Sequence, residues 1–181
     1  MLTKDNNYKV MKLFFDNSDR KFHIREIARQ TNLSAPGVLK ILKKLKKENL
    51  LVSEKENVVE NVWASRNEKF FLLKKCYNFL SVYESGLTDF LKDRYEEPEA
   101  IVVFGSYSNG EDTSESDIDV AIVTKKSVEL DLKKFESVLK RKINILEVQV
   151  GGSEKEFLNN LANGTVVYGF LKVLQSALSI I

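Results

Sequence analysis

The most restrictive feature of the sequence is the segment 101–123, IVVFGSYSNGEDTSESDIDVAIV, in which two apolar runs flank a polar stretch. Short, mostly β-branched apolar runs are typical of buried strands. The first run leads directly into Gly105-Ser106, and the second begins with Asp117-Ile118-Asp119. The segment therefore predicts two buried strands, the first ending in small residues and the second starting in acidic ones.

These end residues suggest a site for phosphate and metal. Glycine at a strand end lets the backbone approach a phosphate, Ser106 can donate a hydrogen bond, and a following helix would offer free N–H groups. Asp117 and Asp119 are two apart on a strand, so their side chains project from the same face. Paired carboxylates suit Mg²⁺, which bridges triphosphate oxygens and offsets charge during an in-line displacement.

The order Gly105-Ser106, ten intervening residues, then Asp117-Ile118-Asp119 resembles the minimal nucleotidyltransferase family of the polymerase-β-like superfamily. The resemblance extends loosely over 98–170. It implies transfer of a nucleoside monophosphate from an NTP with release of pyrophosphate. Gly105 and Ser106 would hold the terminal phosphates. Asp117 and Asp119 would bind Mg²⁺ and serve as catalytic residues.

The family also has a third carboxylate on a neighbouring strand, which helps to bind metal and deprotonates the attacking hydroxyl. The matching strand here places Asn144 at that position, and an amide cannot act as a base. Glu147 lies three residues on, hence on the opposite face of a regular strand, and would reach the metal only through a bulge or a different register. Asn109 stands where the family often has an arginine after Gly-Ser.

Two hypotheses therefore remain for the function. The first is a Mg²⁺-dependent nucleotidyltransferase whose acceptor is a protein, a nucleic-acid end or a small molecule; some antitoxins of this family nucleotidylate a partner toxin. The second is a DNA-binding transcriptional regulator whose nucleotidyltransferase domain senses a nucleotide or serves as a scaffold. The intact stretch from Gly105 to Asp119 favours the first hypothesis, and Asn144 favours the second.

The N-terminal third predicts three short helices followed by a hairpin. Helices are expected over 7–16, 24–31 and 35–48, with Ser34 as the N-cap of the third. In that third helix four apolar residues share about 100° of arc, and lysines occupy the opposite side. Strand-like segments at 50–55 and 58–64 flank a turn at Glu56-Asn57.

This order, and in particular the stretch 24–55, resembles a winged helix-turn-helix domain over roughly residues 5–66. The resemblance implies DNA binding, with the third helix in the major groove. Residues near its start would lie nearest to base edges, and the later lysines nearest to phosphates. The expected DNA-binding residues are Ser34, Ala35, Gly37, Lys40, Lys43, Lys44 and Lys47.

Charge is divided unevenly along the chain. Residues 1–69 contain 15 basic and 9 acidic residues, a charge of +6, whereas residues 70–181 contain 13 and 17, a charge of −4. A basic half joined to an acidic half indicates two functions, one of them facing a polyanion.

Between the two halves, residues 68–95 predict a helix in which apolar residues recur every three or four positions. This seam packs either against the flanking domains or against its twin in a homodimer, and Cys76 is expected to be buried in it. The fold class is thus α+β, with a winged helix-turn-helix (1–66), a linking helix (67–96) and a small mixed α/β nucleotidyltransferase domain (97–181). Helices are also expected over 129–141, 153–163 and 170–180.

Composition excludes several classes of protein. The single cysteine cannot form an internal disulfide or a cysteine-based zinc site, and the single histidine rules out chemistry by paired histidines. No run of about 18 apolar residues and no secretory signal is present, so a cytoplasmic protein without membrane association is expected.

Overall fold

The computed structural model describes residues 5–56, 59–149 and 154–172. The chain divides into two compact units, Met1–Lys74 and Lys75–Ile181. Both helices and sheets are present, which confirms the α+β class. The predicted turn at Glu56-Asn57 extends into residues outside the described ranges, as does most of the predicted helix over 170–180.

The first unit is built from helices and one small sheet. Its elements are α1 (Asn6–Asp16), β1 (Phe22–His23), α2 (Ile24–Thr31), α3 (Ala35–Lys47), β2 (Leu51–Glu56) and β3 (Val59–Ala64). The strands pair antiparallel in the order β1-β3-β2. The three helices and the hairpin strands thus lie where their periodicity predicted them.

Local signals explain the turn that separates α2 from α3. Asn32 ends α2 in the left-handed region, at φ 55°, a conformation that asparagine tolerates better than most residues. Ser34 then caps α3: its hydroxyl oxygen accepts a hydrogen bond from the backbone N–H of Gly37 at 3.3 Å, with Pro36 in the first turn. Val38 and Leu42 are buried on the opposite side of α3 from its exposed lysines.

A long helix follows the hairpin, but it is shorter than predicted. The expected helix over 67–96 is two helices, α4 (Glu68–Ser85) and α5 (Leu87–Arg94). Gly86 separates them at φ 77°, a backbone conformation that side chains disfavour. The boundary between the two units falls within α4, between Lys74 and Lys75.

The predicted seam along this segment is only partly buried. Leu87 is buried, whereas Leu73, Leu80 and Tyr83 are exposed. Cys76 is exposed as well, so the prediction of a buried cysteine is wrong. The buried apolar residues of α4 are instead Phe70, Tyr77 and Val82, so the predicted seam is not the side of this helix that packs.

The second unit adds a four-stranded sheet. Its further elements are β4 (Ala100–Phe104), α6 (Gly105–Asn109), β5 (Ile118–Val123), α7 (Lys133–Leu139), β6 (Ile143–Val148), α8 (Lys155–Ala162) and β7 (Thr165–Gly169). The strand order is β6-β5-β4-β7. Strands β5 and β6 are parallel, with α7 in the crossover between them, and the other pairs are antiparallel.

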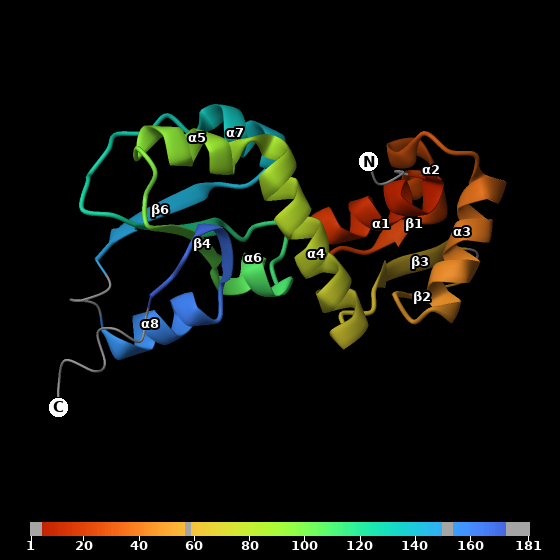
Figure 1. The fold of residues 1–181 in the computed structure, drawn as a ribbon. Coiled ribbons are helices and arrows are strands. Elements are labelled where there is room, and N and C mark those ends of the chain that lie inside the picture. The colour runs from red at the N-terminus through yellow and green to blue at the C-terminus, as the bar shows by residue number, and fades with distance from the viewer. Residues whose placement is uncertain (1–4, 57–58, 150–153, 173–181) are drawn as a thin grey trace. The chain divides into compact units, whose positions relative to one another are not determined.

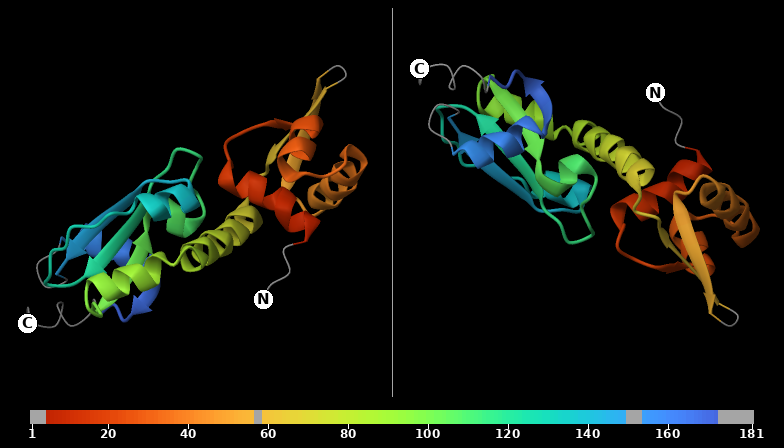
Figure 2. Two further views of the ribbon diagram at one scale, coloured as in Figure 1. Left: turned by 90° about the horizontal axis from the view of Figure 1, so that it is seen from above. Right: turned by 90° about the horizontal axis from the view of Figure 1, so that it is seen from below.

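Helices cover both faces of this sheet. Figures 1 and 2 show α5 and α7 on one face and α8 on the other. Alternation along β5 divides its side chains between two cores: Ile118, Val120 and Ile122 pack with α5 and α7, whereas Ala121 and Val123 pack with Leu161 of α8. Asp119 shares the parity of the second set, so its side chain belongs to the α8 face.

No helix in the described part of the chain has both the length and the apolar character needed to cross a bilayer.

Candidate functional site

Gly105 marks the point where β4 turns into α6. Its φ is 71°, and a Cβ added to it would lie 2.9 Å from Oδ2 of Asp119. The strand pairing explains this proximity, since Phe104 is the register partner of Asp119. Glycine is therefore required here both by the backbone conformation and by the neighbouring carboxylate.

The two aspartates lie at the start of β5. Asp117 immediately precedes the strand and Asp119 is its second residue, with the buried Ile118 between them. The backbone N–H of Ile118 donates to the carbonyl oxygen of Lys142 at 2.8 Å, which ties this end of β5 to the start of β6. Both aspartates remain partly accessible to solvent.

Asn144 on β6 joins the two aspartates. The parallel register pairs it with Asp119. Its amide nitrogen donates to Oδ2 of Asp117 at 3.3 Å and to Oδ1 of Asp119 at 3.1 Å. The side chains of three residues from two neighbouring strands thus converge beside Gly105.

Glu147, the other candidate ligand, lies on the opposite face of the sheet. Its register partner is Ile122, and its Oε1 accepts hydrogen bonds at 2.8 Å from the Tyr95 hydroxyl and from the backbone N–H of Val128. Burial opposes its ionisation, but hydrogen bonds from Ser127, Val128 and Tyr95 outweigh that effect and lower the pKa of Glu147. Burial, followed by the hydrogen bond to Glu147 and its charge, raises the pKa of Tyr95. The Glu147 carboxylate therefore has a structural role: it joins β6 to Tyr95 and Val128 on the face of the sheet opposite to the aspartates.

The donor set fits a hard divalent cation. Two carboxylates supply oxygen ligands, and rotation of the Asn144 amide would present its carbonyl oxygen as a third. No cluster of three His, Cys, Asp or Glu residues able to hold a metal occurs among residues 5–56, 59–149 and 154–172. The site thus has one fewer negative charge than a three-carboxylate site would have.

A buried polar network supports the loop that carries Asp117. Asp112 is 1% exposed; its Oδ1 accepts a hydrogen bond from Asn78 Nδ2 at 2.8 Å, and its Oδ2 lies 3.8 Å from a guanidinium nitrogen of Arg141. Asn78 also donates to the carbonyl oxygen of Tyr107 in α6 at 2.8 Å. The network joins α4, α6, the α6–β5 loop and the residues before β6, so it links every segment that contributes to the site.

Sequence reasoning missed this network. Asp112 lies in the polar stretch GEDTSES, which is typical of a solvated loop, and neither Asn78 nor Arg141 stands in a recognisable motif. Within the loop, Thr113 and Ser116 also hydrogen-bond each other. The density of short polar residues was the one available signal of an ordered loop.

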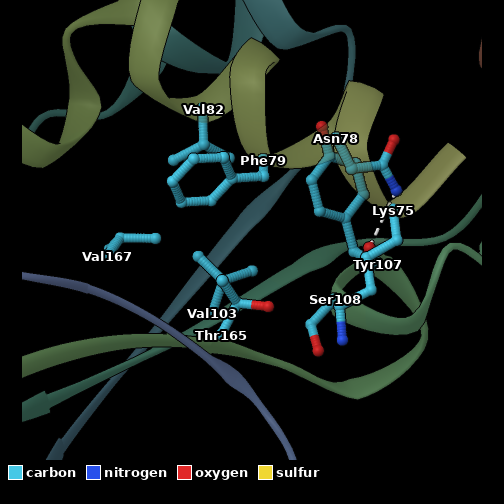
Figure 3. A pocket seen from close by; sticks show the side chains of 9 residues that line it. All are labelled: Lys75, Asn78, Phe79, Val82, Val103, Tyr107, Ser108, Thr165 and Val167. Carbon is cyan, nitrogen blue, oxygen red and sulfur yellow. Dashed lines mark hydrogen bonds between the residues drawn. The ribbon is translucent and has the colours of Figure 1, made fainter. Parts of the chain in front are cut away.

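A pocket elsewhere in the second unit is distinct from this site. Figure 3 shows Asn78, Phe79 and Val82 of α4 on one side of it and Val103 and Thr165 on the other. Its volume of about 10 Å³ leaves room for a single water molecule. Val103 packs into the core on the α5 and α7 face, opposite to Asp119. The pocket is therefore too small for a nucleotide and on the wrong face for the aspartates.

The predicted DNA-binding residues lie on α3 and at its N-cap. Ser34 and Ala35 are exposed, Gly37 is half-buried, and Lys40, Lys43, Lys44 and Lys47 are all exposed. Lys46 has a different role, because its ammonium group contacts Glu60 at 2.7 Å and Ser53 at 2.9 Å on the hairpin. The exposed lysines of α3 thus form a basic surface, while Lys46 anchors the hairpin to the helix.

A family model of known proteins matches part of the second unit. Residues 85–166 match the family model of the nucleotidyltransferase domain. This nucleotidyltransferase region includes Gly105, Ser106, Asp117, Asp119 and Asn144, and it covers less than half of the chain. No curated protein matches the sequence.

One solved structure, described as the crystal structure of the toxin-antitoxin with AMP-PNP, is similar to part of the chain. The sequences are 20% identical, the TM-score is 0.42, and the alignment covers 53% of this chain and 85% of that one. A similarity of this size supports no conclusion about function.

Proposed function

We propose that the second unit binds an NTP with Mg²⁺ and transfers its nucleoside monophosphate to a hydroxyl acceptor. The observation that carries this proposal is the convergence of Asp117 and Asp119 on one amide nitrogen beside Gly105, inside the nucleotidyltransferase region. The Asn144 amide donates to both carboxylates, and carboxylate oxygens are the ligands that Mg²⁺ prefers in proteins. A divalent metal is the natural partner of such a pair.

Each residue of the site has a proposed role. Asp117 and Asp119 hold the metal, and the backbone of Gly105 and the hydroxyl of Ser106 contact the terminal phosphates. Bound Mg²⁺ neutralises triphosphate charge and stabilises the leaving pyrophosphate. The acceptor is a protein, a nucleic-acid end or a small molecule.

Asn144 supports a second candidate function for the same site. Its amide cannot take the proton from an attacking hydroxyl, so transfer would proceed without the base that a carboxylate supplies there. A domain that binds NTP and Mg²⁺ but turns over slowly would serve as a nucleotide sensor in a DNA-binding regulator. Binding and turnover therefore require separate measurements.

Binding is tested by thermal melts with each of the four NTPs, with and without Mg²⁺. At about 100 times Kd, a ligand adds ~2.7 kcal/mol to the free energy of unfolding, a shift of a few degrees. We expect a Mg²⁺-dependent shift that Asp119→Asn abolishes. Asp89→Asn, which removes an exposed carboxylate from α5, is the matched control and should keep the shift. No shift with any NTP would exclude nucleotide binding and leave the unit as a scaffold.

We also propose that the first unit binds DNA as a winged helix-turn-helix domain. The order of three helices and an antiparallel hairpin supports this, as does the basic surface of α3. The proposal places Ser34, Ala35, Gly37 and Lys40 nearest to base edges. Lys43, Lys44 and Lys47 would contact phosphates.

Salt dependence tests the DNA proposal directly. The logarithm of the binding constant should fall linearly with the logarithm of salt concentration, with a slope near −0.9 for each phosphate neutralised. Lys43→Ala/Lys44→Ala should reduce the magnitude of that slope by about 1–2. Lys133→Ala/Lys134→Ala removes the same charge from exposed positions of α7 and should leave the slope unchanged. Equal effects of the two double variants would rule out α3 as the DNA-binding surface.

A further inference from the structure

Lys142 lies directly before β6, on the side of the sheet that carries the aspartates. The backbone N–H of Ile118 donates to the carbonyl oxygen of Lys142 at 2.8 Å, a bond that continues the parallel pairing of β5 with β6. In that pairing Asn144 lies opposite Asp119. Lys142 precedes Asn144 by two residues, so the alternation of an extended strand directs both side chains to the same face. The same register, extended by one residue, sets Lys142 opposite Asp117.

The ammonium group of Lys142 is available to a ligand. Lys142 is exposed, and among the residues that the structure describes its side chain forms no ion pair and no hydrogen bond. Asp117 instead accepts a hydrogen bond from the Asn144 amide at 3.3 Å. The neighbouring Arg141 differs, because its side chain is 8% exposed and its guanidinium group lies 3.8 Å from the buried carboxylate of Asp112. Lys142 is therefore free to bind an anion that reaches this edge of the site.

The charge of the site indicates which anion that is. A nucleoside triphosphate carries more negative charge than one Mg²⁺ neutralises, and the two aspartates add to the excess. Helix α6 offers the phosphates only neutral groups, because Gly105–Asn109 includes no charged side chain. On this face of β4, β5 and β6 the described side chains are acidic, amide or apolar, and Lys142 is the one cation beside them. Lysine binds phosphate as a point charge.

We propose that Lys142 contacts the phosphate oxygens of the bound NTP and offsets the negative charge that the metal leaves. This inference rests on the proposed function, because it needs an NTP held at Asp117 and Asp119. It gives neighbouring residues different tasks: the two carboxylates hold the metal, and the ammonium group holds the phosphates. Binding of the metal alone and binding of the phosphates should therefore respond to different substitutions.

Calorimetric titration of the full chain tests this assignment. The probes are the NTP that gives the largest Mg²⁺-dependent thermal shift and inorganic tripolyphosphate, which has no base, each with Mg²⁺. Lys142→Met should weaken binding of both probes by about tenfold or more, since a hydrogen bond to a charged group is lost. Lys142→Arg should retain most of the affinity. Lys125→Met, the matched control, removes the same charge from an exposed position beyond the other end of β5 and should leave both affinities unchanged.

Metal binding without nucleotide supplies a second readout. Mn²⁺ has the charge of Mg²⁺ and suits the same oxygen ligands, and electron paramagnetic resonance measures the free ion. Asp119→Asn should weaken Mn²⁺ binding. Lys142→Met should leave it unchanged or strengthen it, because the substitution removes a positive charge beside the carboxylates. Melting curves without ligand establish that all variants fold.

The outcomes separate this inference from the proposed function. NTP binding that Lys142→Met leaves unchanged, or that Lys125→Met weakens equally, would overturn the inference while the proposed function stands. Loss of Mn²⁺ binding in Lys142→Met would also overturn it, because the lysine would then act through the aspartates. A wild type that binds no NTP would contradict the proposed function itself, and the inference with it.

Discussion

At the scale of single residues, the chemistry of the site depends on one functional group. Asn144 occupies the position beside Asp119 where a carboxylate would complete a three-acid site. The amide satisfies both aspartates by donating hydrogen bonds, which a third carboxylate could not do without a cation. Asparagine at this position therefore makes the metal-free site more stable than a carboxylate would, and it supplies no base.

A carboxylate at position 144 should have the opposite effects. Asn144→Asp should increase transfer of label from an α-labelled NTP by about 10²-fold or more, because it supplies a general base and a third metal ligand. Without Mg²⁺ the variant should melt below the wild type, because three carboxylates repel one another. With Mg²⁺ this difference should disappear.

The control for this experiment is Asn144→Asp combined with Asp119→Asn. The double variant keeps two carboxylates but loses the second aspartate, and it should transfer no label. Unchanged transfer in Asn144→Asp alone, together with a normal melt in the absence of Mg²⁺, would show that Asn144 is not part of the reactive site.

At the scale of secondary-structure elements, β6 serves two purposes on its two faces. Asn144 contacts the aspartates on one face, and Glu147 accepts hydrogen bonds from Tyr95 and Val128 on the other. They are three positions apart in the sequence, so the alternation of a regular strand places them on opposite sides. Glu147 was the acidic residue nearest in sequence to the expected third ligand, and strand geometry alone keeps it from that role.

The lowered pKa of Glu147 gives the fold a predictable dependence on pH. Its hydrogen bonds to the ionised form stabilise the fold above its unfolded pKa of 4.5, and this contribution is lost as the pH falls through the folded pKa. Tyr95→Phe should lower the free energy of unfolding at pH 7 by about 1–2 kcal/mol, since the hydroxyl donates to a charged group. The difference from the wild type should shrink below pH 4.5.

Denaturant unfolding at several pH values measures this effect. Tyr168→Phe removes a hydroxyl from β7 instead and is the matched control, for which a small and pH-independent change is expected. A Tyr95→Phe penalty that is equally large at pH 3 and pH 7 would contradict the assignment to ionised Glu147.

At the scale of the whole molecule, the division of charge corresponds to the division into units. The exposed lysines of α3 lie in the basic half, and the paired aspartates lie in the acidic half. The sequence located this division near the helix after the hairpin. The boundary falls inside α4, because Phe70 and Lys74 are buried among residues of the first unit and Val82 among those of the second.

Much of the protein follows from the sequence by itself. Periodicity identified the helices and the alternating strands, since these depend on the local repeats of 3.6 residues in a helix and 2 in a strand. The motif from Gly105 to Asp119 predicted that these residues lie together, and the antiparallel pairing of β4 with β5 places Gly105 beside Asp119.

The parallel pairing of β5 with β6 places Asn144 against Asp119, 25 residues away in the sequence, as the family resemblance implied. Tertiary structure alone decided the rest. The packing of Asp112 against Asn78 and Arg141 buries a charge that looked solvated. Cys76 shows the opposite case: the sequence pattern predicted a buried side chain, and the structure places it at the surface. A local pattern states which side of an element is apolar, but only contacts between distant segments determine what covers that side.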